Sequence, residues 1–146
     1  MNQLNSKLLL DKSLQQADKA ASWLKRSLEK SKAIKITPKL SEADFDVLEN
    51  LTSRFARLCD ILVQKVFRAI SAHELEPDGS LIDHINRAAK RGIVTDEKVM
   101  RELKELRNTI AHEYTEEELS ELFEKIRASS PELLQILENA KKYVKA

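Results

Sequence analysis

The chain has 146 residues with a formal net charge of +1, so its length fits a single domain (residues 1–146) and its charge does not mark it as a nucleic-acid binder. Only two Gly and three Pro leave few turns for a sheet, which favours an all-α, antiparallel bundle of about five helices. A single Cys excludes an internal disulfide framework and a cysteine-based zinc site.

A first long helix is expected over residues 5–33, because apolar residues recur three and four apart from Leu14 to Leu28. Residues 1–39 contain nine Lys or Arg against three acids. This ratio is typical of a solvated helix face, and an RNA track is the alternative. Pro38 marks the break after this helix.

Ser41 is expected to cap a second long helix, whose apolar positions run from Phe45 to Ile70. Ile61 adds apolar surface away from the main stripe, which indicates a central place in the bundle or at a dimer contact. Cys59 lies within this apolar run, and we interpret it as a small core residue rather than a reactive thiol.

The segment 77–79, Pro-Asp-Gly, predicts a turn, because Pro presets φ and Gly supplies a positive φ. A short third helix should begin at Ser80 and end at Gly92. His73 and His84 lie beside the ends of these helices. We expect them to be surface or cap histidines.

Thr95 is expected to cap the next helix, which carries residues 107–114, Arg-Asn-Thr-Ile-Ala-His-Glu-Tyr. On an α-helix Asn108 and His112 share a face, whereas Arg107 and His112 lie about 140° apart. A joint site of Arg107 and His112 therefore needs a bend near His112, a second copy of the chain, or both.

Thr115 and Glu118 form a capping box that begins an acidic helix, and residues 130–131, Ser-Pro, are expected to begin a separate last helix. The periodicity of these helices also predicts which side chains are mostly buried. These are Phe45, Leu48, Phe55, Leu62, Leu103, Leu106, Ile110, Leu122 and Phe123.

The pattern Arg107-x4-His112-x-Tyr114, with Asn108 directly after the arginine, resembles the signature of HEPN domains. It is most similar to the HepT-like toxins that are encoded beside a minimal nucleotidyltransferase (MNT) antitoxin. The order of helices extends the resemblance to about residues 41–143. The resemblance implies a HEPN-like helical bundle and a toxin-antitoxin system whose toxin is a metal-independent endoribonuclease, with RNA (tRNA or mRNA) as substrate.

The resemblance also implies a role for each residue of the motif. Arg107 and His112 of two protomers would be the catalytic residues of a composite site at a homodimer cleft, with Asn108 in a supporting role. Histidine suits proton transfer near neutral pH, and arginine stays charged and binds phosphate. Tyr114 would be an exposed phenol to which the MNT antitoxin attaches AMP.

Other kinds of site find little support in the sequence. No His, Asp and Glu set has metal-ligand spacing and no Gly-rich phosphate loop occurs, so we expect neither a metal nor a cofactor. No apolar stretch approaches about 20 residues and no signal peptide is recognisable, so we expect a cytoplasmic protein without a membrane partner.

Two alternative functions stay open. The chain could be a non-catalytic substrate-binding or regulatory subunit of a nucleotidyltransferase, or a plain helical dimerisation module. Without the resemblance, the simpler interpretations are a surface histidine for His112 and a packing residue for Tyr114.

Overall fold

The computed structural model describes residues 3–145, and these contain no strand, so the predicted all-α fold is confirmed. The helical elements in chain order are α1 (Gln3–Ser31), α2 (Glu42–Ile61), η1 (Leu62–Val66), α3 (Phe67–His73), α4 (Leu81–Lys90), α5 (Glu97–Thr109) and α6 (Glu116–Lys145). Because α2, η1 and α3 follow one another without a break, the described residues form five continuous helices, in agreement with the predicted number.

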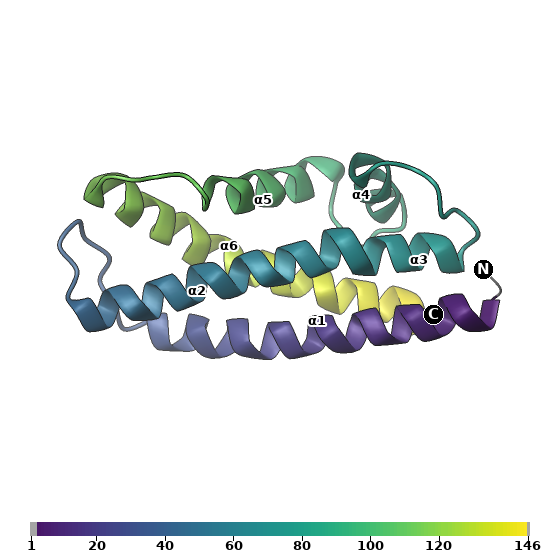
Figure 1. Cartoon of the computed structure of the whole chain (residues 1–146), viewed down its shortest axis with the longest axis horizontal. Coiled ribbons are helices and arrows are strands. Elements are labelled where there is room, and N and C mark those ends of the chain that lie inside the picture. The colour runs from purple at the N-terminus through teal and green to yellow at the C-terminus, as the bar shows by residue number, and fades with distance from the viewer. Residues whose placement is uncertain (1–2, 146) are drawn as a thin grey trace.

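The first two long helices run in opposite directions, whereas the last one, α6, runs in roughly the same direction as the α2–α3 helix (Figure 1). Helix α1 lies antiparallel along α2 and α3, and α6 packs against both α1 and α2. The shorter helices α4 and α5 lie on the side of the α2–α3 helix opposite α1 (Figure 1). This arrangement makes the α2–α3 helix the centre of the bundle.

The core explains why this helix is central. It contributes fully buried residues along its whole length, including Leu48, Phe55, Leu62 and Phe67. Burying each such side chain stabilises the fold by about 1.5–3 kcal/mol relative to leaving it exposed. Six of the nine side chains predicted to be buried are buried; Phe45, Leu106 and Ile110 are only half-buried and pack against the edge of the core.

The predicted separate helix at residues 130–131 is wrong, because α6 continues through Pro131 to Lys145. Proline inside a helix costs about 3 kcal/mol, since it lacks an N–H and its ring crowds the preceding turn. The apolar stripe of α6 continues across this position, with Ile126 before it and Leu133 after it both fully buried. Burial of this stripe offsets the cost, and Pro131 itself faces solvent.

The N-cap residues predicted from the sequence are found in the structure at three helix starts, and one helix start differs. Ser41, Ser80 and Thr115 each accept a hydrogen bond from the backbone N–H three residues later, as the sequence predicted. The predicted cap at Thr95 is wrong: Asp96 caps α5, and its Oδ1 accepts a 3.0 Å hydrogen bond from the N–H of Val99. Both residue types cap well, so a one-residue shift is hard to exclude from sequence alone.

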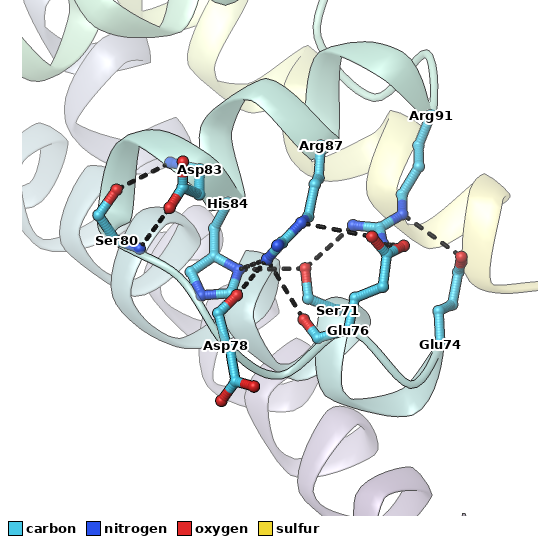
Figure 2. A network of polar contacts seen from close by, with 9 residues as sticks. All are labelled: Ser71, Glu74, Glu76, Asp78, Ser80, Asp83, His84, Arg87 and Arg91. Atoms are coloured by element: carbon cyan, nitrogen blue, oxygen red, sulfur yellow. Dashed lines mark hydrogen bonds and ion pairs between the residues drawn. The ribbon is translucent and has the colours of Figure 1, made fainter.

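Arg87 of α4 and Arg91, which directly follows this helix, hold the turn between α3 and α4 (Figure 2). Arg87 Nη1 donates to the carbonyl of Asp78 at 2.6 Å. Arg91 donates from Nη2 to Glu76 Oε1 and from Nη1 to Ser71 Oγ, both at 3.1 Å. The turn is thereby fixed by charged hydrogen bonds rather than by apolar packing.

His84 is not a surface or cap histidine, as the sequence suggested, but is fully buried beneath this turn (Figure 2). Its Nδ1 lies 3.1 Å from Ser71 Oγ and 3.3 Å from Arg87 Nη1. Arginine can only donate, so a hydrogen bond from Arg87 requires Nδ1 to accept, as it does in a neutral imidazole. Burial, followed by the charge of Arg87, lowers the pKa of His84. Its Nε2 has no hydrogen-bond partner among residues 3–145.

Candidate functional site

Arg107 lies in the last turn of α5 and is held by a carboxylate of the central helix. Its Nε donates to Asp60 Oδ1 at 2.8 Å, and its Nη2 donates to Asp60 Oδ2 at 2.9 Å. These hydrogen bonds raise the pKa of Arg107 above its ordinary value. The guanidinium is therefore charged and fixed in orientation, with three of its five N–H groups not engaged by Asp60.

Asp60 is the residue of this site that the sequence interpretation missed. The signal was an acid inside an apolar run, between the buried Cys59 and Leu62. Burial, and then the charge of Asp60, raise the pKa of Cys59 to about 12. The thiol therefore stays protonated, and the prediction that Cys59 is a core residue is confirmed. The π-helical turn η1 begins two residues after Asp60, and such turns are frequent at functional sites.

His112 lies outside the motif helix, because α5 ends at Thr109. The chain turns there, with the N–H of His112 donating to the carbonyl of Thr109 at 3.1 Å. A bend near His112, one of the alternatives that a joint site with Arg107 would need, is therefore present. The predicted stacking of Asn108 and His112 on one helix face is wrong, because only Asn108 is helical; both side chains are exposed.

Tyr114 is half-buried, and its hydroxyl donates to the carbonyl of Thr109. The expectation of an exposed phenol is therefore only partly met, since the polar end of the side chain is bound to the backbone. The rings of His112 and Tyr114 are stacked, with centroids 6.4 Å apart and an interplanar angle of 26°. The hydrogen bond of Tyr114 closes the turn that carries His112.

Arg107 and Tyr114 line two different hollows of the surface. Arg107 and Asp60 line a groove of about 820 Å³ along α1 and α2. Tyr114 lines a second groove of about 710 Å³ between α5 and α6. Within residues 3–145 no hydrogen bond, ion pair or ring contact joins Arg107 to His112. One copy of the chain thus presents Arg107 with Asp60, and His112 with Tyr114, as two separate pairs.

The groove beside Tyr114 is acidic. Its charged lining consists of one base, Lys125, and five acids, which are Glu102, Glu105, Glu118, Glu121 and Glu132. This lining repels a phosphate backbone and attracts a basic surface.

Comparison with known proteins identifies the family. A family model described as "Ribonuclease HepT-like" matches residues 24–140, a range that includes Asp60 and the whole of residues 107–114. The chain belongs to the HepT-like ribonuclease family. The resemblance drawn from the motif is thereby confirmed at the level of the family and of the fold. No curated protein and no solved structure matched the chain.

Two further observations describe this HepT-like chain. Across residues 3–145, no three side chains of His, Cys, Asp or Glu come together as a metal-binding group. None of the helices described is both long enough and apolar enough to cross a membrane.

Proposed function

We propose that this HepT-like chain is the toxin of a toxin-antitoxin pair and acts as a metal-independent endoribonuclease. Its composite site would form at a homodimer cleft from Arg107 and His112 of both copies. The observation that carries the proposal is the exposed imidazole of His112 on a turn just after an arginine that is fixed by Asp60, in a chain of a ribonuclease family.

The reaction assigns one proton transfer to each histidine. His112 of one copy takes the proton of the ribose 2′-hydroxyl, and the oxygen attacks the adjacent phosphorus. The bond from phosphorus to the 5′-oxygen breaks, and His112 of the other copy gives a proton to the leaving oxygen. The products are a 2′,3′-cyclic phosphate and a 5′-hydroxyl end.

Arg107 supplies positive charge to the crowded phosphorane of the transition state. Asp60 occupies the Nε edge of the guanidinium, which leaves both N–H groups of Nη1 and one of Nη2 for phosphate oxygens. Asn108 is exposed on the same last turn of α5. Its amide can bond a phosphate oxygen or orient the imidazole.

The need for a second copy follows from the separation of the two pairs. A single chain places Arg107 along the α1–α2 groove and Tyr114, with His112 stacked on it, at the α5–α6 side. It also offers only one His112, whereas the reaction needs a base and an acid. A twofold axis near the end of α5 would bring two arginines and two histidines into one cleft.

Control of the toxin would act through Tyr114. The MNT antitoxin would join the tyrosine oxygen to the α-phosphorus of ATP and release pyrophosphate. This step removes the hydroxyl proton, so the hydrogen bond to Thr109 is lost. The phosphate of the attached AMP would lie beside His112, where its charge and bulk oppose RNA. The acidic groove next to Tyr114 suits a basic surface on the antitoxin.

The test is cleavage of RNA by the purified full-length chain in EDTA. We expect products with cyclic phosphate and 5′-hydroxyl ends from the wild type and none from His112→Ala. Equal cleavage by both proteins, or cleavage only with added Mg²⁺, would contradict the proposal. No cleavage by either protein, together with a tight complex with the nucleotidyltransferase, would favour the non-catalytic subunit.

A further inference from the structure

The groove along α1 and α2 that includes Arg107 has a charged lining made mainly of bases. We call it the basic groove. Its charged and aromatic lining includes Lys19 and Trp23 of α1, Arg54 and Arg57 of α2, Lys65 of η1 and Arg107 of α5. Asp60 is the one acid among its lining residues in the described part of the chain. This acid pairs with Arg107, so the rest of the groove carries no negative charge.

The other four bases of the basic groove have no acidic partner within residues 3–145. Lys65 Nζ donates to the neutral amide oxygen of Gln16 at 3.2 Å. The side chains of Lys19 and Arg57 make no hydrogen bond or ion pair in this part of the structure. Elsewhere bases commonly meet acids, as Lys141 meets Asp18 at 2.9 Å. Positive charge is thus left uncompensated along one groove.

Trp23 adds an aromatic surface to these charges. Its side chain is large and apolar, yet the residue is 43% exposed. Arg54 lies over the ring, with Cζ 5.0 Å from the centroid, and is held there by a 2.6 Å hydrogen bond to Ser27 Oγ. The guanidinium of Arg26 also lies over the ring, with Cζ 5.7 Å from the centroid. Indole and guanidinium planes in contact are surfaces on which nucleobases stack.

The charges also argue against the groove as a contact between two copies of the chain. A twofold contact centred on this surface would place its unpaired bases against the same bases of the partner. Like charges in contact cost free energy, whereas a polyanion would neutralise them and release counterions.

We propose that the basic groove binds a single-stranded stretch of RNA and leads it to Arg107. This proposal rests on the proposed ribonuclease function and names the path of its substrate. The lining of α2 and η1 runs from Ser53 to Lys65, which spans about 18 Å at 1.5 Å per residue. That length holds at most about five phosphates of one strand, since a stacked strand rises about 3.4 Å per nucleotide.

The first experiment measures the salt dependence of RNA binding. The probe is a labelled single-stranded 12-nucleotide RNA, and the protein is full-length His112→Ala, which removes cleavage. The double variant Arg57→Gln/Lys65→Gln should reduce the slope of log K against log salt by about 1.4, because single strands contribute about 0.7 per neutralised phosphate. The same arithmetic predicts roughly 25-fold weaker binding at 0.1 M salt.

A matched control carries the same loss of charge outside the basic groove. Lys12 and Lys90 are exposed and do not line it. Lys12→Gln/Lys90→Gln in the same background should keep the slope and the affinity. A similar loss in both double variants would show that only net charge matters, and would overturn the groove as a site.

The second experiment uses Trp23 as a probe, because it is the one tryptophan of the chain. RNA should change its fluorescence emission with the affinity seen for the labelled RNA. Trp23→Ala should weaken binding about 5- to 150-fold, whereas Trp23→Phe keeps most of it. Unchanged emission at saturating RNA would overturn the proposal, as would an emission change that follows protein concentration instead, which would indicate a contact between copies.

Failure of the groove and failure of the nuclease give different results. Normal cleavage by Arg57→Gln/Lys65→Gln, with unchanged RNA affinity, would reject the groove and keep the ribonuclease. RNA binding in the groove without cleavage by the wild type would keep the groove and reject catalysis.

Discussion

Asp60 accepts two hydrogen bonds from Arg107, at 2.8 and 2.9 Å, and so ties the end of α5 to the central helix. The two side chains are partly exposed, at 37% and 29%. An ion pair in this setting adds about 1 kcal/mol or less to stability, because water screens it. Its larger effect is geometric, since it sets which edge of the guanidinium faces away from the core.

Asp60→Asn should therefore lower RNA cleavage far more than it lowers stability. We expect Arg107 to lose its fixed orientation and kcat to fall by about tenfold or more. The melting temperature should fall by about 4 °C or less, in line with the small worth of the pair. The measurements are single-turnover cleavage and thermal unfolding.

The control for this variant is Asp18→Asn, which breaks the ion pair of similar length with Lys141. It should lower the melting temperature by a similar amount and leave cleavage at the wild-type rate. Equal losses of activity in both variants would mean that Asp60 acts through general stability and does not position Arg107.

Arg107→Ala and His112→Ala should each abolish cleavage as homodimers, yet recover part of it when mixed. In the proposed cleft a mixed dimer keeps one arginine and one histidine, contributed by different copies, so one of the two proton transfers keeps its catalyst and only the other is left to water. If both residues instead acted within one chain, no protomer of the mixed dimer would hold both, and the mixture would stay inactive. The measurement is cleavage after subunit exchange, with each single variant as control. Activity of the mixture no higher than that of its components would argue against the composite site.

The helices and most caps of this fold are predictable from sequence because they depend on local spacing. The apolar spacing of residues 45–70 and the cap at Ser41 both depend on residues only three or four positions apart in the sequence. The pairing of Arg107 with Asp60 joins positions 47 residues apart, and no local pattern encodes which acid an arginine meets. For that reason the motif was recognisable and its support by Asp60 was not.

Two other positions where the structure differs from the sequence-based prediction also depend on contacts between residues far apart in the sequence. Pro131 normally favours a helix start, but the packing of α6 on α1 and α2 overrides this preference. His84 is polar and near a helix start, yet α3 supplies Ser71 and α4 supplies Arg87 to satisfy its Nδ1 inside the bundle. Tertiary contacts decided both positions, and the sequence around them carries no trace of those contacts.

The buried His84 should make the fold less stable in mild acid. Its pKa in the folded chain is lowered by burial from an ordinary value of about 6.5. The unfolded chain therefore binds the proton first, and stability is lost as the pH falls below about 6.5 until the folded histidine also titrates. Thermal unfolding measured from pH 7.5 to 5 should show the decline in melting temperature.

His84→Asn tests this assignment, because an amide oxygen can accept the hydrogen bonds of Nδ1 but takes up no proton in this range. The variant should show a flatter pH profile than the wild type. His112→Asn replaces an exposed histidine and should keep the wild-type profile. If His84→Asn loses stability in acid as steeply as the wild type does, another group is responsible.

Tyr114→Phe should remain a toxin and escape neutralisation by modification. The substitution removes the acceptor oxygen for AMP and keeps the ring that stacks on His112. It also removes the hydrogen bond to Thr109, at a cost of about 1 kcal/mol, so the turn loosens slightly and cleavage should fall by less than tenfold. Intact mass after incubation with the nucleotidyltransferase and ATP should show added AMP on the wild type and none on Tyr114→Phe.

The control is Tyr143→Phe, which removes a phenol that is hydrogen-bonded to Glu74, the residue directly after α3. This variant should be modified like the wild type. Equal modification of Tyr114→Phe would remove Tyr114 from the mechanism, and a tight complex without any modification would mean that the antitoxin acts by binding alone.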